Sequence, residues 1–278
     1  MQKIELKSIA KINVGLKVLR KRDDGFHDLQ TLFYPVKSLY DDILIAKSKK
    51  FQFRTNIAEL NTEENLIVKA VKMIESQLNI KFDVEISCKK SIPQGAGLAG
   101  GSSNAATVLL GLIKLFDLEL PNKRLSKIAL ELGSDVPYFL NPVPSFGTSR
   151  GEVLEQINFP LKGYLLIVNP GIHISTKEAF QNVKKDPSLI NYNRLIVDGE
   201  FDFNEIKRTV QNDFEEYVFE KYPQIAKIKT DLYEFGARFA LMTGTGSTVY
   251  GIFDDLLKAE YAASQLNSSF MKLVSNLG

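Results

Sequence analysis

The chain has 278 residues, of which 44% are hydrophobic and 24% are charged, a composition typical of a folded globular protein. Thirty-five lysines and arginines against 33 aspartates and glutamates leave a formal net charge of only +2. Because nucleic-acid binders usually carry a marked positive excess, this balance excludes nucleic acid as an expected partner.

Cysteine and histidine are rare in this sequence. The one cysteine excludes an internal disulfide framework and fits a reducing compartment. Two histidines and one cysteine can scarcely build a zinc site, so we predict no metal ligands. The amino terminus lacks the apolar core of a signal peptide, and no apolar run approaches the roughly 20 residues that cross a bilayer. We therefore expect a cytoplasmic protein without a membrane partner.

The first predicted elements are two strands joined by a turn. Residues 10–18 alternate between apolar and polar side chains, with Lys11 and Asn13 on the polar side. On an ordinary sheet these two side chains would simply face water. Residues 23–27 form a turn that leads into a second strand over residues 29–36.

A helix and a third strand follow. Asn61 and Glu64 have the spacing of a capping box, and apolar residues then recur at helical spacing from Ile67 to Leu78. Residues 81–88 alternate cleanly, which predicts a strand with one buried face. Cys88 falls on that face and is predicted to be a buried structural thiol.

A glycine-rich loop connects this strand to the next helices. The loop spans Pro93–Ser103, and a helical pattern runs on from about Asn104 to Phe116. A second helix is predicted over residues 125–132, where Gly133 stops it. Asp135 then lies at the predicted start of a further helix.

The second half of the chain has the pattern of a separate α+β unit. Residues 164–168 predict a buried strand, and Ser175–Glu178 is a capping box that opens a helix. Residues 194–203 are poorly periodic and predict a loop. Two strands joined by a tight turn are predicted at residues 239–242 and 248–253.

The glycine loop gives the strongest indication of function. Glycine reaches positive φ and lets a ligand approach the backbone closely, and the following helix offers N–H donors and the positive end of its dipole. Together these features predict a cradle for a triphosphate; the alternative is a plain turn whose serines cap the helix. The loop is not a Walker A motif, because Gly101 stands where the lysine belongs. The predicted nucleotide-binding residues are Pro93, Gly95, Ala96, Gly97, Leu98, Ala99, Gly100, Gly101, Ser102 and Ser103.

Three other polar residues have a plain interpretation. An aspartate at a helix start, as at Asp135, is often only a cap that complements the helix dipole. His27 and His173 fit ordinary surface positions. The sequence contains no G-x-S-x-G elbow, so a serine hydrolase is not supported.

Taken together, these segments resemble the GHMP kinase superfamily. Its phosphate loop has the form Pro-x-Gly-x-Gly-Leu-x-x-Gly-Ser-Ser, which Pro93–Ser103 matches, and its carboxy-terminal glycine motif is similar to Thr243–Ser247. Ala99 departs from the glycine that many relatives carry, which removes some backbone freedom.

Three further segments resemble one branch of that superfamily, whose members phosphorylate a cytidine diphosphate-linked alcohol. They are Ala10–Asn13, Arg22–Thr31 and Leu132–Phe139. The matches run in order along nearly the whole chain. Phe26 departs from the tyrosine that is usual in this branch, so a hydroxyl contact is lost while an aromatic face remains.

The resemblance implies roles for individual residues. Asp135 becomes the catalytic base, and Lys11 becomes its partner and a clamp on the transferred phosphoryl group. The cytosine would bind between aromatic rings, with Phe26 as one ring and Phe180 as the candidate for the other, while His27 hydrogen-bonds the base edge. Further implied acceptor-binding residues are Asn13, Thr176 and Gly244.

The resemblance also implies the fold. We expect an α+β, two-domain GHMP kinase fold, with a left-handed β-α-β unit in the amino-terminal domain and a ferredoxin-like α/β sandwich in the carboxy-terminal domain. The left-handed crossover is a rare exception that pattern alone does not predict. We place the domain boundary near Asn158, which gives residues 1–157 as the ATP-binding domain and residues 158–278 as the carboxy-terminal domain.

The implied reaction moves the γ-phosphate of ATP, with Mg²⁺ bridging the phosphates, to the 2-hydroxyl of the acceptor in non-mevalonate isoprenoid precursor biosynthesis. One alternative is another small-molecule kinase of the superfamily, of the homoserine or mevalonate type, against which the segment Asp24–Thr31 argues. The other is a non-catalytic nucleotide-binding regulator on the same fold, against which the joint presence of Lys11 and Asp135 argues. A monomer or weak homodimer is expected.

Overall fold

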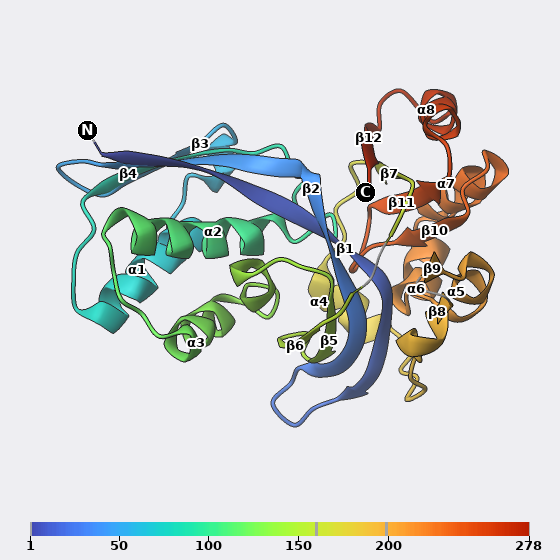
Figure 1. Ribbon diagram of the computed structural model, residues 1–278, viewed down its shortest axis with the longest axis horizontal. Helices are drawn as coiled ribbons and strands as arrows, with labels where there is room; N and C mark the ends of the chain where they lie inside the picture. Colours follow the sequence, from blue (N-terminus) through green and yellow to red (C-terminus); the bar gives the residue numbers. More distant parts are fainter. Residues whose placement is uncertain (1, 159–160, 198–199, 278) are drawn as a thin grey trace. The chain divides into compact units, whose positions relative to one another are not determined.

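The computed structural model describes residues 2–158, 161–197 and 200–277, and its backbone divides into two compact units (Figure 1). Unit 1 comprises Met1–Lys11, Pro35–Gln94 and Ala99–Val143, and unit 2 comprises Ile12–Tyr34, Gly95–Leu98 and Pro144–Gly278. Each unit is assembled from several segments of the chain. The predicted division of the chain into two continuous domains, residues 1–157 and 158–278, stays a prediction.

Unit 1 contains a β-α-β unit, as expected. Strand β3 (Gln52–Thr55) pairs in parallel with β4 (Val84–Lys89), and helix α1 (Leu66–Leu78) connects them. On its other side β4 pairs antiparallel with the later part of β2 (His27–Lys47), and β2 also pairs with β1 (Lys3–Lys21). The strand predicted at residues 81–88 is thus confirmed from Val84 onward, and Cys88 is buried within it, where burial raises the pKa of its thiol to about 12.

Three helices of unit 1 lie on one face of these strands (Figure 1): α1, α2 (Gly100–Leu115) and α3 (Asn122–Leu132). Helix α2 packs closely against the sheet at Gly111. A Cβ atom on Gly111 would lie 2.6 Å from Ile45 Cδ1 and 2.8 Å from Leu6 Cδ1, so the absent side chain permits this approach. The short 3-10 helix η2 (Pro137–Leu140) follows α3.

The start of α1 corrects one prediction. Asn65 caps the helix, because its Oδ1 accepts a hydrogen bond of 2.9 Å from the Ile67 N–H. Asn61 was the predicted cap, but its side chain accepts from the Thr55 N–H at 2.8 Å instead. It ends the 3-10 helix η1 (Ala58–Leu60), whose bonding competes with the capping-box pattern.

The central sheet of unit 2 is ferredoxin-like, as expected. Its antiparallel strands are β7 (Tyr164–Asn169), β10 (Phe239–Met242), β11 (Val249–Phe253) and β12 (Met271–Asn276). Their order in the sheet is β10-β11-β7-β12. Helices lie between the first and second strands and between the third and fourth, which is the β-α-β-β-α-β order of that fold.

The helices of unit 2 enclose a core of apolar side chains from this sheet and from β1. They are α4 (Thr176–Asn182), α5 (Phe203–Thr209), α6 (Phe214–Lys221), α7 (Pro223–Glu234) and α8 (Leu256–Gln265). The capping box predicted at the start of α4 is confirmed in part, since Ser175 Oγ accepts from the Glu178 N–H at 3.3 Å.

Two further features complete unit 2. Strands β5 (Ser145–Ser149) and β6 (Val153–Gln156) do not join the four-stranded sheet: β5 pairs antiparallel with the early part of β2, and β6 pairs antiparallel with β5. The loop predicted at residues 194–203 is wrong in part, because it contains the end of the 3-10 helix η3 (Tyr192–Leu195) and the paired strands β8 (Ile196–Val197) and β9 (Glu200–Phe201). Strands of two residues are too short to create a readable alternation.

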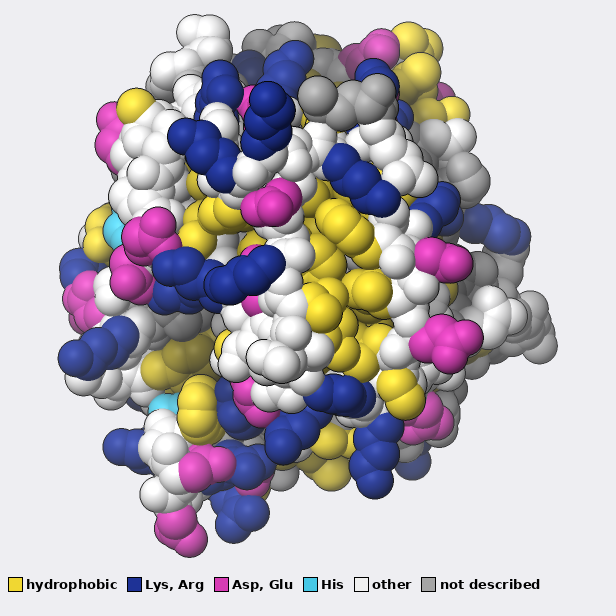
Figure 2. All heavy atoms as spheres, turned by 90° about the vertical axis from the view of Figure 1, so that its left-hand side faces the viewer, with side chains coloured by type: hydrophobic (Ala, Val, Ile, Leu, Met, Phe, Trp, Pro, Cys, Tyr) yellow, Lys and Arg dark blue, Asp and Glu magenta, His cyan; other side chains and the backbone are white. Residues whose placement is uncertain are grey.

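The surface carries charges of both signs. On the face shown in Figure 2, lysines and arginines are mixed with aspartates and glutamates around a band of hydrophobic side chains. This mixture agrees with the small net charge of the chain. Within the described ranges, no helix combines the length and apolar character that a bilayer span requires.

Candidate functional site

Unit 1 brings together Lys11 and Asp135, the two predicted catalytic residues. The Nζ atom of Lys11, on β1, lies 3.8 Å from Oδ2 of Asp135. The Lys11 side chain is 4% exposed, whereas that of Asp135 is 34% exposed. The plain interpretation, in which Lys11 and Asn13 face water, is therefore wrong, because both faces of this part of β1 are covered.

The two charged groups of this pair differ in their exposure to solvent. Burial lowers the pKa of Lys11 below its ordinary value of 10.5, while the nearby Asp135 carboxylate opposes that shift. The pair sets a buried cation beside a carboxylate that solvent or a ligand can reach. Such an arrangement suits a hydroxyl group that must be oriented while negative charge develops nearby.

Asp135 does not cap the helix that follows it. Helix α3 ends at Gly133, and the Val136 N–H donates back to the Gly133 carbonyl at 3.1 Å. The 3-10 helix η2 starts at Pro137, with Val136 as its N-cap and without a side-chain cap. The cap interpretation of Asp135 is therefore not supported, and its carboxylate is left to act beside Lys11.

The end of the glycine loop forms the start of α2. This helix begins at Gly100, four residues before its predicted start, after Ala99 in the left-handed conformation with φ of 55°. Within the described residues no side-chain hydrogen bond caps α2. Gly101 is exposed, and a Cβ atom there would meet only Leu66 Cδ1, at 3.5 Å. The backbone of this first turn is thus a donor surface of the kind that binds anions.

The two serines of the loop have different surroundings. Ser102 is half-buried, whereas Ser103 is 1% exposed and accepts a hydrogen bond of 2.7 Å from Ser8 Oγ. Ser103 therefore serves the packing of α2 on β1 in this structure. Among the other predicted nucleotide-binding residues, Pro93 is half-buried, and Ala96 and Leu98 are buried.

In unit 2 the middle of the glycine loop meets the carboxy-terminal glycine motif. Thr243 Oγ1 donates to the Gly97 carbonyl at 3.2 Å, and a Cβ atom on Gly97 would lie 1.9 Å from the Thr243 carbonyl oxygen. A Cβ atom on Gly244 would lie 2.8 Å from Gly97 Cα. The approach of the two loops therefore requires glycine on both sides.

Asn13 belongs to the same contact. The backbone N–H of Asn13 donates to Thr243 Oγ1 at 3.0 Å, and its side-chain Oδ1 lies 3.2 Å from the same hydroxyl. The Nδ2 atom of Asn13 donates to Thr31 Oγ1 at 2.8 Å. Asn13 thus anchors the glycine motif to β1. Gly95 lies against His173, where a Cβ atom would be 2.6 Å from Nδ1.

The predicted base-binding residues also lie in unit 2, where two of them are in direct contact. The rings of His27 and Phe180 are stacked, with centroids 4.9 Å apart and an interplanar angle of 25°. Phe26 is 46% exposed, and the Arg150 guanidinium lies 3.5 Å from its ring centroid. The structure therefore places His27 against Phe180 and Arg150 on Phe26, and the contact of Arg150 is one that no sequence signal indicated.

The surroundings of His27 favour the neutral imidazole. Burial and the positive charges of Lys185 and Lys21 lower its pKa from the ordinary value of 6.5. A neutral imidazole carries one donor and one acceptor, which suits hydrogen bonding to a base edge. Thr176, the first residue of α4, is exposed, and its hydroxyl lies 3.4 Å from that of Thr245 in the glycine motif.

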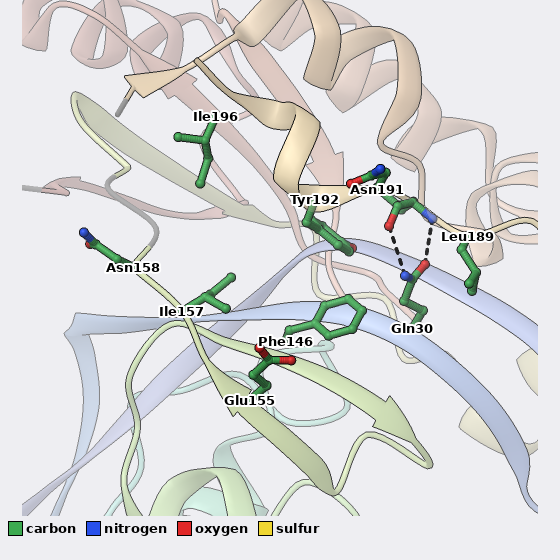
Figure 3. Close-up of a pocket in the computed structure, with 10 residues that line it drawn as sticks. Gln30, Phe146, Glu155, Ile157, Asn158, Leu189, Asn191, Tyr192 and Ile196 are labelled. Atoms are coloured by element: carbon green, nitrogen blue, oxygen red, sulfur yellow. Dashed lines mark hydrogen bonds between the residues drawn. The ribbon is translucent and has the colours of Figure 1, made fainter. Parts of the chain in front are cut away.

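A separate cavity of about 570 Å³ in unit 2 contains none of the predicted site residues (Figure 3). The Gln30 side chain borders it and is held by two hydrogen bonds, since it donates to the Ile190 carbonyl at 3.0 Å and accepts from the Ile190 N–H at 2.7 Å. Phe146 and Tyr192 form part of its apolar wall. No group of three or more metal-ligating side chains occurs within residues 2–158, 161–197 and 200–277.

Comparisons with known proteins agree with this geometry. Residues 65–141 match the family described as GHMP kinases N terminal domain, and residues 198–272 match GHMP kinases C terminal. The chain is 38% identical to 4-diphosphocytidyl-2-C-methyl-D-erythritol kinase from Chlorobium phaeobacteroides, over 97% of this chain and 96% of that protein.

Solved structures point the same way. A crystal structure of 4-(cytidine 5'-diphospho)-2C-methyl-D-erythritol kinase superposes with a TM-score of 0.83 at 30% identity, over 99% of each chain. Homoserine kinase from Cytophaga hutchinsonii superposes with a TM-score of 0.74 over 100% of this chain and 95% of that chain, but at 18% identity. The second similarity concerns the fold alone.

Proposed function

Because the chain belongs to the 4-diphosphocytidyl-2-C-methyl-D-erythritol kinase family of the GHMP kinases, we propose that it transfers the γ-phosphate of ATP to the 2-hydroxyl of 4-diphosphocytidyl-2-C-methyl-D-erythritol. The observation that carries this proposal is the Lys11–Asp135 pair, at 3.8 Å. Phosphoryl transfer depends mainly on alignment and on compensation of charge, and this pair supplies a group for each task.

In the proposed reaction Asp135 orients the acceptor hydroxyl and accepts its proton. Its partial exposure supports this role, because the carboxylate must reach a bound ligand. Lys11 pairs with this carboxylate and offsets negative charge on the transferred group. Its burial supports the role, because charge compensation is stronger where water is excluded.

The glycine loop is proposed to hold the triphosphate of ATP. The exposed Gly101 and the uncapped first turn of α2 support this assignment, since backbone N–H groups there lack side-chain caps. Mg²⁺ would arrive on the phosphate oxygens of ATP and neutralise their charge. In this proposal one carboxylate, that of Asp135, lies beside the transferred phosphoryl group.

The cytidine part of the acceptor is proposed to bind at Phe26, His27 and Phe180. The ring faces offer apolar partners for a base, and a neutral His27 offers a donor and an acceptor to its edge. Thr176 and Gly244 are proposed to contact the rest of the acceptor. Asn13, which is buried, would act by holding the glycine motif in place.

Single-turnover phosphorylation with labelled ATP tests the function. The protein is offered 4-diphosphocytidyl-2-C-methyl-D-erythritol, homoserine and mevalonate in parallel. We expect label on the cytidine acceptor alone. Label on homoserine or mevalonate would establish a different kinase of the superfamily, and ATP binding without transfer to any alcohol would indicate a nucleotide-binding regulator.

A further inference from the structure

Asp41 makes no contact that the proposed chemistry uses, yet it is a fully buried carboxylate in the later part of β2. Its Oδ1 atom accepts two backbone hydrogen bonds, from the Ser91 N–H at 2.7 Å and from the Ile92 N–H at 2.9 Å. These two residues immediately precede Pro93, the first residue of the glycine loop. One oxygen of Asp41 therefore fixes the entrance of the loop.

The other oxygen of Asp41 fixes the exit of the loop. Oδ2 accepts from Asn104 Nδ2 at 2.8 Å and from Lys90 Nζ. Asn104 lies in α2, directly after Ser103, the last residue of the loop. Lys90 Nζ also donates to Asn104 Oδ1 at 2.9 Å, which closes a ring of contacts among the three side chains.

The network continues to the first turns of α2. Asn104 Nδ2 donates to Ser8 Oγ at 2.9 Å, and Ser8 Oγ donates to Ser103 Oγ at 2.7 Å. A Cβ atom on Gly100 would lie only 3.2 Å from Lys90 Nζ, so the lysine packs directly under the helix start. All these residues belong to unit 1.

The free-energy cost of burying these charged groups indicates a role beyond stabilising the fold. Burying a charged pair is expensive, and well-packed apolar residues often stabilise a fold as well or better. What an apolar replacement cannot do is accept from two loop amides and from a helix side chain at once. We propose that Asp41 is a positioning residue, which sets the separation of the two ends of the glycine loop and so aims its backbone donors at the phosphates of ATP. This inference rests on the proposed function, in which that loop binds ATP.

The first test is Asp41→Asn. Asparagine keeps an oxygen for the Ser91 and Ile92 amides, but its NH₂ group points toward Lys90 and Asn104, where an acceptor is needed. The entrance of the loop thus loses its link to the exit. We expect the Kd for ATP, measured by calorimetry without turnover, to rise by about 10- to 100-fold, which is the size of effect expected when a hydrogen bond from the loop backbone to a charged phosphate is lost. The Kd for the cytidine acceptor should stay within about 2-fold.

Glu75→Gln is the matched control. Glu75 is also a buried carboxylate of unit 1, and it accepts from the Phe82 N–H at 2.8 Å and from Lys81 Nζ at 3.1 Å. It ties the end of α1 to the following segment and has no contact with the glycine loop among those described. We expect it to lower Tm as Asp41→Asn does but to leave the Kd for ATP unchanged.

A charge-swapped variant tests the mechanism itself. Asp41→Asn combined with Asn104→Asp returns a carboxylate to Lys90 and restores a donor–acceptor pair between residues 41 and 104. We expect ATP affinity to recover to within about 3-fold of the wild type. If Asp41→Asn does not fold, Asn104→Ala cuts the same link while leaving the Asp41–Lys90 pair intact, and it carries the same expectation for ATP.

The outcomes separate the inference from the proposed function. An unchanged Kd for ATP in a folded Asp41→Asn variant, or an equal loss with Glu75→Gln, would overturn the positioning role. If the wild type binds ATP but phosphorylates no cytidine acceptor, the proposed acceptor is wrong while the calorimetric test of Asp41 still holds.

Discussion

The Nζ atom of Lys11 lies 3.8 Å from Oδ2 of Asp135, and the two side chains differ sharply in exposure, at 4% and 34%. The lysine is enclosed by the fold, whereas the carboxylate remains accessible from solvent. This asymmetry supports the different tasks that we propose for the two charges. The carboxylate can handle a proton, and the lysine can hold a fixed positive charge in a site of low polarity.

The first prediction concerns Asp135→Asn. The amide keeps the size of the side chain but cannot accept the acceptor's proton, so kcat should fall by about 10²-fold or more. ATP binding should persist, because the glycine loop is untouched. Steady-state rates and calorimetry measure the two effects. Near-normal turnover, or loss of the folded state, would mean that Asp135 is structural.

The second prediction concerns pH. Burial lowers the pKa of Lys11, so the lysine loses its proton at a pH below its ordinary value of 10.5. If the charged form is needed, kcat should fall as pH rises through that lowered pKa. In Lys11→Arg the guanidinium stays charged at all accessible pH values, so the alkaline limb should move upward even if the maximum rate is lower. A limb at the same pH in both proteins would assign it to another group.

The third prediction contrasts two glycines of the same loop. Gly101 is exposed and a Cβ atom there makes only an ordinary contact, so Gly101→Val should fold. It should weaken ATP binding by about 10-fold or more, since losing one hydrogen bond to a charged group costs roughly 1.5–3 kcal/mol. Gly97→Ala should instead lower Tm, because φ is 76° and the Cβ atom would lie 1.9 Å from the Thr243 carbonyl oxygen. Unchanged ATP affinity in folded Gly101→Val would remove this residue from the nucleotide site.

Local sequence patterns predicted about half of the helices and strands, and missed β3, β5, β6, β12 and the helices α5 to α8. The strands around Cys88 and Ile167 have clear alternation or a compact apolar run, and both are confirmed. The ferredoxin-like order of unit 2 came from resemblance, because the pairing of strands distant in sequence leaves no local periodic trace.

The sequence patterns failed where contacts between distant segments determine the local structure. Asn61 and Asn65 both lie before α1, and only the contact of Asn61 with the end of β3 shows which of them caps the helix. Asp41 lies beyond the strand predicted at residues 29–36 and carries no local signal, because its side-chain partners are 49 to 63 positions away. Arg150 is likewise placed on Phe26 by the approach of two turns that are far apart in sequence.

The fourth prediction concerns Ala99, the last residue before α2. Its φ of 55° is in the left-handed region, where a Cβ atom costs about 1–2 kcal/mol. Ala99→Gly should therefore raise stability by a net amount of about 0.5–1 kcal/mol, after the greater freedom of glycine in the unfolded chain is subtracted. Ala96→Gly is the control, because Ala96 is buried in the same loop and outside the left-handed residues. It should lower Tm; a lower Tm for Ala99→Gly as well would contradict the assigned backbone conformation.

The last prediction concerns the stacked pair His27 and Phe180, whose ring centroids are 4.9 Å apart. Phe180→Ala should weaken acceptor binding by about 5- to 150-fold, since base stacking on an aromatic ring contributes roughly 1–3 kcal/mol. The KM for ATP should stay nearly unchanged. His27→Ala should weaken acceptor binding too, and it should relax discrimination against uridine analogues because a polar contact to the base edge is lost.

The contact between the two rings also predicts that the effects of the two substitutions are not independent, which only a double variant can test. Because Phe180 supports the His27 ring, removing either residue should disturb the other, and the double variant should lose less binding energy than the sum of the two single losses. Phe180 also packs edge-on against the buried Phe214, at 4.9 Å, so Tm must be measured alongside binding. Additive losses in acceptor binding would show that the rings act independently. Equal losses of acceptor and ATP binding together with a lower Tm would show that Phe180 is a packing residue and not part of a base site.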